Sequence, residues 1–284
     1  MSKKDLPKVA VTGRPGVQGE IAASAAKRWN PDIKAAAQSA DEAAVSISIL
    51  DPIGADPWGD GVSAKRIAGA LRAIGGKDVV VNINSPGGDF FEGLAIYNLL
   101  REYQGHVTVR VLGMAASAAS VIAMAGDEVL IGRAAFLMIH NTWVVAAGDR
   151  HAFRDVADWL EPFDQAAASI YAARTGLDQA DIAAQLDKET WLGGEAAVAQ
   201  GFADGLLSAD ELDQAQAQAR GDLSPLAAQK KLDLMLAGKA TKSERRALVA
   251  ALKSGGKPGA APSGTSSAAI ASMAHGALAK LNSL

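Results

Sequence analysis

The stretch DVVVNINSPGGDFFEGLAIYNLLREYQGHVTVRVLG, residues 78–113, decides the fold of this chain. Its opening run, DVVVNIN, is rich in valine and isoleucine and predicts a strand. A loop with two adjacent glycines follows, and apolar residues then recur at the spacing of an amphipathic helix. The closing run, HVTVRVLG, alternates and predicts a second strand that ends at Gly113. Strand, helix and strand in close succession indicate a parallel crossover unit and therefore an α/β fold.

The same order of elements continues on both sides of this stretch. Upstream, AVSISILDPIG predicts a strand, and SAKRIAGALRAIGG predicts a helix that ends at paired glycines. Downstream, SAASVIAMAG predicts a short buried helix, and DEVLIG and AFLMIH predict two more strands. A long helix is expected from Asp149 to Arg174. Together these segments predict a stack of βαβ units.

Composition limits the classes of function. The chain has 284 residues, of which 49% are apolar and 21% charged, and its formal net charge is −3. These values are typical of a globular protein and give no reason to expect nucleic acid or a membrane as a partner. The absence of cysteine excludes a thiol nucleophile and a thiolate metal site, and no metal or cofactor is expected. The N-terminal MSKKDLPKV lacks the apolar core of a signal peptide, so a cytoplasmic location is expected.

The character of the sequence changes along the chain. We expect an N-terminal extension over residues 1–43, a catalytic domain over 44–210 and a polar, partly disordered C-terminal tail over 211–284. Ten Lys or Arg and five Asp or Glu follow residue 210, so the tail carries a net charge of +5 and the rest of the chain −8. The tail also contains SGGKPGAAPSGTSS, which has the composition of a flexible linker.

The motif NSPGGD, from Asn84 to Asp89, lies where a predicted strand meets a predicted helix. Gly87 and Gly88 allow backbone conformations that are closed to other residues, and Asp89 can cap the helix. Such a loop presents backbone N–H groups at a helix N-terminus, where they can bind an anion or an oxyanion. A plain turn is the alternative. A phosphate-binding loop is disfavoured because no Lys-Ser/Thr pair follows the glycines.

Two serines in the apolar stretch VLGMAASAASVIAMAGDEV are candidates for chemistry. Ser117 is expected at a strand-to-helix corner, which would expose its hydroxyl beside the N–H of Ala118, as a serine nucleophile requires. Ser120 is expected about one turn into the helix, as a small packing residue. For Ser117 considered alone, a packing or capping role is the alternative.

A serine nucleophile needs a base, and the chain has four histidines. His140 ends the predicted strand AFLMIH, at the same end of a parallel sheet as the two corners, which makes it the best candidate. His106 begins a strand, His151 starts the long helix and His275 lies in the tail. Spacing alone does not select the acid that would orient the imidazole.

Four motifs together, NSPGG, GMAASAAS, MIHN and ETWLGGEAAVAQGFAD, resemble the Clp-type serine peptidases. The similarity spans roughly residues 44–207 and is greatest to the phage-encoded Clp-like head maturation (prohead) proteases. The resemblance implies a Clp-peptidase and crotonase-like α/β stack of βαβ units with a protruding helical region. It also implies a homo-oligomeric ring with inward-facing active sites.

The resemblance also implies roles for individual residues. Ser117 falls on the nucleophile and His140 on the general base, while Gly88 and Ala118 fall on the residues whose N–H groups form the oxyanion hole. Glu189 occupies the place of an aspartate in the housekeeping enzymes. Alignment on Trp191 and Leu192 favours Glu189. Asp187 is the alternative acid, because aspartate is the more usual residue type, although this choice requires a two-residue shift. If this block is extended, residues 187 and 189 point the same way, so the pattern does not separate them. A third alternative is that a backbone carbonyl or a water molecule orients His140.

Three functions follow as hypotheses. The first is a serine endopeptidase with a Ser-His-acid triad that processes phage capsid-assembly proteins such as scaffold, portal or coat, in the host cytoplasm or inside an assembling prohead. The second is a crotonase-type enzyme acting on acyl-CoA thioesters, because that fold also uses paired N–H donors. The third is a catalytically inactive structural ring. The Ser-His pair favours the first. No Walker-type loop is present, so ATP-driven unfolding would require a separate partner chain.

Overall fold

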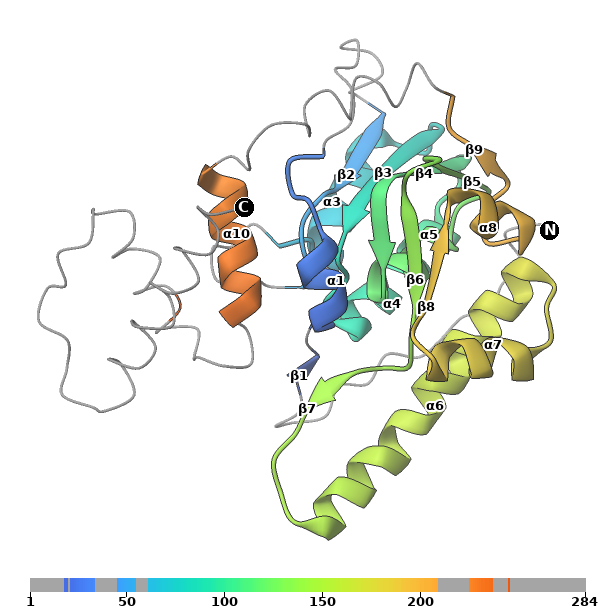
Figure 1. The fold of residues 1–284 in the computed structure, drawn as a ribbon. Coiled ribbons are helices and arrows are strands. Elements are labelled where there is room, and N and C mark those ends of the chain that lie inside the picture. The colour runs from blue at the N-terminus through green and yellow to red at the C-terminus, as the bar shows by residue number, and fades with distance from the viewer. Residues whose placement is uncertain are drawn as a thin grey trace, which may run out of the picture. The chain divides into compact units, whose positions relative to one another are not determined.

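The computed structural model describes residues 18–19, 21–33, 45–54, 61–208, 225–236 and 245. Its centre is a seven-stranded sheet flanked by helices (Figure 1), and a separate two-stranded sheet joins β1 to β7. This arrangement confirms the predicted α/β class. The strands are β1 (Gln18–Gly19), β2 (Ser46–Ile49), β3 (Val79–Ser85), β4 (Val107–Ala116), β5 (Glu128–Ile131), β6 (Phe136–Ile139), β7 (Val144–Val145), β8 (Thr190–Gly193) and β9 (Gly205–Leu206). The helices are α1 (Ala23–Arg28), α3 (Ala64–Ile74), α4 (Phe90–Glu102), α5 (Ala118–Ala123), α6 (Arg150–Thr175), α7 (Gln179–Asp187), α8 (Gly194–Ala199) and α10 (Pro225–Leu236).

The sheet is parallel except at one pair of strands. Its order is β2–β3–β4–β5–β9, and β6 pairs with β4 and with β8. Only the β6–β8 pair is antiparallel among the pairings of this sheet. Strand β4 is long enough to pair with β5 through Thr108–Val111 and then with β6 through Met114–Ala116. The C-terminal ends of β3, β4 and β6 therefore meet at one edge of the sheet.

The structure corrects the predicted end of β4. The strand was expected to stop at Gly113, but it continues to Ala116 because Met114, Ala115 and Ala116 pair with β6. A glycine inside a strand marks a close approach more often than an end. Here a Cβ on Gly113 would lie 2.6 Å from Cδ1 of Ile33, so the residue makes room for the segment that follows α1.

The helix ends follow the sequence signals. Asp89 accepts hydrogen bonds from the backbone N–H groups of Phe91 and Glu92, which confirms the predicted cap of α4. Asp149 caps α6 in the same way, and Gly176 closes that helix in the left-handed conformation. The predicted long helix is thus confirmed within one residue at each end.

The two faces of the sheet are covered by different parts of the chain. Along β4, Ala115 belongs to the main core with α4, α5 and α6, whereas Met114 and Ala116 pack with α1. Successive side chains of a strand point to opposite faces, so α1 lies on the face away from α5. The fully buried Trp29 anchors this second cluster.

Helix α6 has an anchored half and a projecting half. Its buried residues all lie at or after Phe163, and the first half extends beyond the sheet together with β7 (Figure 1). Phe153 in that half and Trp143 beside β7 are large apolar side chains that remain about half exposed. This half is the protruding helical region that the family resemblance implied.

Both predicted domain boundaries, after residues 43 and 210, lie outside the described residues. The chain divides into two compact units, residues 1–235 and residues 236–284. Helix α10 lies within the predicted tail, yet Leu232 is buried and Nζ of Lys230 forms an ion pair with Oδ1 of Asp51. Across the described residues, no helix has the length and apolar character needed to cross a membrane.

Candidate active site

The glycine loop after β3 lies directly against the Ser117 corner. Gly87 and Gly88 have φ values of 87° and 144°, which side chains rarely adopt. A Cβ on Gly87 would lie 2.8 Å from Cβ of Ser117 and 3.2 Å from the backbone nitrogen of Ala118. A Cβ on Gly88 would lie 2.2 Å from the carbonyl oxygen of Ile53. Only glycine fits here, and the close fit brings the loop beside the N–H of Ala118.

Ser117 stands at the strand-to-helix corner that the sequence predicts. It follows the last residue of β4, precedes the first residue of α5 and has a φ of 53°, a positive value that is unusual for serine. Its N–H donates to the carbonyl of Met138 at 2.9 Å, which ties the corner to β6. Backbone strain of this kind is concentrated at functional sites.

His140 lies next to this corner. It follows the last residue of β6, and its Nε2 is 2.7 Å from Oγ of Ser117. Burial lowers the pKa of His140 below the ordinary imidazole value, and the negative charge of Glu189 partly opposes that shift. A neutral imidazole within hydrogen-bond reach of a hydroxyl can accept its proton.

Strand pairing brings Glu189 toward His140. In the antiparallel β6–β8 register, Ile139 faces Thr190 and Met138 faces Trp191. The pairing ends one residue short of both, so the turn that holds Glu189 lies beside the end of β6 that His140 follows. The charge of Glu189 acts on His140, and its Oε1 accepts a hydrogen bond of 3.1 Å from Nε1 of Trp191.

Asp187 points to a different partner. Its Oδ1 accepts a hydrogen bond of 2.7 Å from Nδ2 of Asn141. The premise that residues 187 and 189 would be extended and point the same way is wrong, because Asp187 ends α7 and Glu189 has a φ of 50°. The turn between helix and strand separates the two carboxylates.

Ser120 is buried, as the sequence predicts, and it also bridges two elements. Its Oγ lies 2.6 Å from the carbonyl oxygen of Ser117 and 2.8 Å from the hydroxyl of Tyr171 on α6. Burial raises the pKa of Tyr171, so the phenol stays neutral and able to donate. The long helix is thus connected to the serine corner through two hydroxyls.

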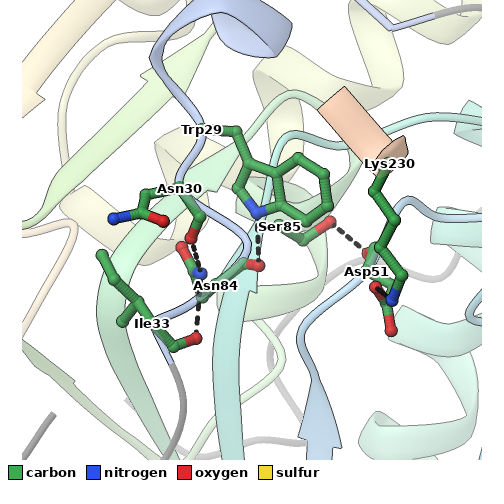
Figure 2. A network of polar contacts seen from close by, with 7 residues as sticks. All are labelled: Trp29, Asn30, Ile33, Asp51, Asn84, Ser85 and Lys230. Atoms are coloured by element: carbon green, nitrogen blue, oxygen red, sulfur yellow. Dashed lines mark hydrogen bonds and ion pairs between the residues drawn. The ribbon is translucent and has the colours of Figure 1, made fainter. Parts of the chain in front are cut away.

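The strand that leads into the glycine loop is held from both sides (Figure 2). The indole N–H of Trp29 donates to the carbonyl of Asn84 at 3.0 Å, and Nδ2 of Asn84 donates to the carbonyls of Asn30 and Ile33 at 2.8 and 3.1 Å. On the other side, Oγ of Ser85 donates to the carbonyl of Asp51 at 2.8 Å, the residue that Lys230 contacts.

Several residues near the site carried no recognisable signal in the sequence. Tyr171 and Trp29 contact it across more than 50 residues of sequence, a separation at which no local pattern predicts pairing. Trp191 lies within the acid block, but nothing in the sequence predicts its hydrogen bond to Glu189. Within the parts of the chain that the structure describes, no group of three or more His, Asp or Glu could hold a metal ion.

Comparison with known proteins identifies the Clp protease family, which is the family that the sequence motifs resemble. The Clp protease family model matches residues 63–210, which is more than half of the chain. Over 137 residues, or 46% of this chain, the sequence is 31% identical to the ATP-dependent Clp protease proteolytic subunit of Bacteroides fragilis and covers 65% of it. Over 136 residues it is 32% identical to that of Ligilactobacillus salivarius and covers 68% of it.

The matched segment therefore spans about two thirds of the length of these curated relatives. The residues that the family model matches, 63–210, include the glycine loop, the Ser117 corner, His140 and the acid block. The family match and the parallel βαβ architecture agree, and the chain belongs to the Clp protease family.

Proposed function

We propose that this chain is a serine peptidase in which Ser117 is the nucleophile and His140 the general base. The observation that carries the proposal is the 2.7 Å contact between Oγ of Ser117 and Nε2 of His140 at a strand-to-helix corner with a positive φ. A nucleophile within hydrogen-bond reach of its base is the geometry that covalent acyl transfer requires.

The reaction follows from this geometry. Nε2 of His140 takes the hydroxyl proton as Oγ of Ser117 attacks the scissile carbonyl, and the N–H groups of Gly88 and Ala118 stabilise the oxyanion. The imidazolium then gives its proton to the leaving amine, which departs and leaves an acyl-enzyme. Water, deprotonated by His140, attacks this ester and releases the acid product, which restores Ser117.

Glu189 is the acid that we assign to His140 in this mechanism. The β6–β8 register and the effect of its charge on the pKa of His140 support Glu189 over Asp187, whose carboxylate binds Asn141. An ionised carboxylate beside Nδ1 holds the imidazole in the tautomer that leaves Nε2 free to accept the serine proton.

The substrates that we propose are proteins of phage capsid assembly, cleaved by a homo-oligomeric ring. The support is the resemblance of GMAASAAS, MIHN and the acid block to the phage-encoded Clp-like prohead proteases. The curated relatives are named as proteolytic subunits of an ATP-dependent protease. In this protein, ATP dependence would require a separate partner chain that unfolds the substrate.

An active-site serine reagent tests the chemistry. A fluorophosphonate probe should modify Ser117, as located by peptide mass spectrometry, and the Ser117→Ala variant should remain unlabelled. Digestion of scaffold, portal and coat proteins by the wild-type chain and by this variant tests the substrates. Hydrolysis of acyl-CoA thioesters without peptide cleavage would instead support the crotonase-type hypothesis, which family membership does not favour.

A further inference from the structure

Trp191 lies between the acid block and the helix that covers the second face of the sheet. We propose that Trp191 is a positioning residue for Glu189, and that Arg28 of α1 holds Trp191 in place. Under this proposal Arg28 and Trp29 support the active site, so this part of the chain is more than an N-terminal extension. The inference rests on the proposed function of Glu189.

Trp191 contacts the carboxylate of Glu189 directly. The indole Nε1 donates to Oε1 of Glu189 at 3.1 Å, and the two side chains come from positions 189 and 191 on either side of the start of β8. This bond occupies one carboxylate oxygen and leaves the other to accept from His140. Hydrogen bonds to a charged group are stronger than those between neutral groups.

The side chain of Glu189 needs such a contact to hold its carboxylate in one position. Glutamate has one more rotatable bond than the aspartate that the family resemblance places here, so its carboxylate samples more positions. Glu189 also lies in the turn before β8 and has a φ of 50°, so its side chain is outside the regular part of the strand. A fixed donor restores the precision that the shorter side chain would have had.

The indole of Trp191 is in turn contacted by Arg28 of α1. The guanidinium carbon of Arg28 lies 4.3 Å from the centre of the Trp191 ring, within the range of a cation–π contact. Phe136 meets the same indole edge-on, with ring centroids 6.5 Å apart. Trp191 also packs against the cluster that Trp29 and Met138 share.

Adjacent residues of the N-terminal segment therefore contact both sides of the catalytic centre. Arg28 acts through Trp191 on the acid, and Trp29 binds the carbonyl of Asn84, four residues before Gly88 (Figure 2). The same short segment thus supports Trp191, which donates to Glu189, and the strand that leads into the glycine loop.

Titration of His140 by NMR tests the positioning role without relying on activity. The background is Ser117→Ala, and its four imidazoles are assigned by single replacements. Trp191→Phe keeps the ring and removes the donor, so Glu189 should move away and the pKa of His140 should fall, as it should in Glu189→Gln. The double variant should match Glu189→Gln alone, because Trp191 acts through that carboxylate.

Rates give the second readout. With Ser117 present, Trp191→Phe should lower kcat about tenfold with little change in KM, since a hydrogen bond to a charged group is lost. Arg28→Met, on an exposed position that does not threaten folding, should lower kcat about twofold, and Arg28→Lys should restore most of it. Lys27→Met removes the neighbouring exposed charge and is the matched control.

Additive effects of Trp191→Phe and Glu189→Gln on the pKa of His140, or an unchanged pKa in Trp191→Phe, would overturn the inference. A drop in kcat of the same size for Lys27→Met and Arg28→Met would overturn the role of Arg28. If the wild-type chain cleaves no peptide while the NMR coupling holds, the proposed function fails and the positioning role stands.

Discussion

The Ser117 corner and the acid block are built by different means. At the corner, two glycines, a strained serine and the β4–β6 pairing fix the geometry through the main chain in a buried setting. In the acid block, the half-exposed carboxylate of Glu189 lies in a turn and accepts a hydrogen bond from the side chain of Trp191. Geometry set by the backbone can therefore be inferred from sequence, whereas geometry set by side chains can be inferred only from the fold.

Removing the nucleophile should give the largest effect. Ser117→Ala should lower peptide hydrolysis by roughly 10⁴-fold or more, because the members of a triad act as a unit. Steady-state kinetics with a peptide substrate measures the loss. Activity within tenfold of the wild type would show that the corner is not the reactive centre.

Removing the base should be nearly as damaging. His140→Ala should cost about 10³–10⁴-fold in kcat, since proton transfer then falls to water. His151→Ala, at an exposed position on α6, serves as the matched control and should remain active. Equal losses in the two variants would point to a general effect on folding or assembly.

The two acids should differ in the size of their effects. Glu189→Gln should lower kcat by about 100-fold with little change in melting temperature, because charge and tautomer control are lost while shape is kept. Asp187→Asn should have a mild effect, because its partner is Asn141. The opposite ranking would assign the third role to Asp187.

The pH dependence of the rate tests the effect of Glu189 on His140. Burial lowers the pKa of His140, so the acid limb of kcat/KM should lie below the ordinary imidazole value of 6.5. The charge of Glu189 raises that pKa, and Glu189→Gln should therefore move the limb further toward acid while lowering kcat. A limb that moves toward neutral pH would contradict the assigned position of Glu189.

The smallest effect is expected from loss of the hydrogen bond between Tyr171 and Ser120, next to the Ser117 corner. Tyr171→Phe removes a hydroxyl that forms a hydrogen bond with Ser120. Loss of one hydrogen bond costs about 1 kcal/mol, which corresponds to a decrease of roughly fivefold in kcat or in the folding equilibrium constant. Kinetics and thermal unfolding of this variant measure both quantities. A loss of 100-fold or more would place the Tyr171–Ser120 bridge in the catalytic machinery.

The sequence predicted the elements that local chemistry controls. Asp89 marks a helix start because a cap is a local requirement, and Ser117 and His140 meet because parallel strands end at one edge. The end of β4 was missed because pairing with β6 overrides the glycine at position 113.

The contacts of the second sheet face could not be predicted. Trp29 reaches Asn84 across 55 residues, and nothing in the local pattern of α1 identifies that partner. The choice between Asp187 and Glu189 stayed open because it depends on where α7 ends, and helix ends are the least certain part of a sequence-based prediction.

Pro162 gives α6 an uneven resistance to local opening. Proline has no N–H, so one main-chain bond of the helix is missing just before the anchored half begins at Phe163. Trp159 is the last side chain before Pro162 that packs against the core, and the turns before it have no buried residue, so few packing contacts oppose their fraying. Amides before position 162 should therefore exchange with solvent much faster than those that follow, and bending of the projecting half should concentrate at this residue.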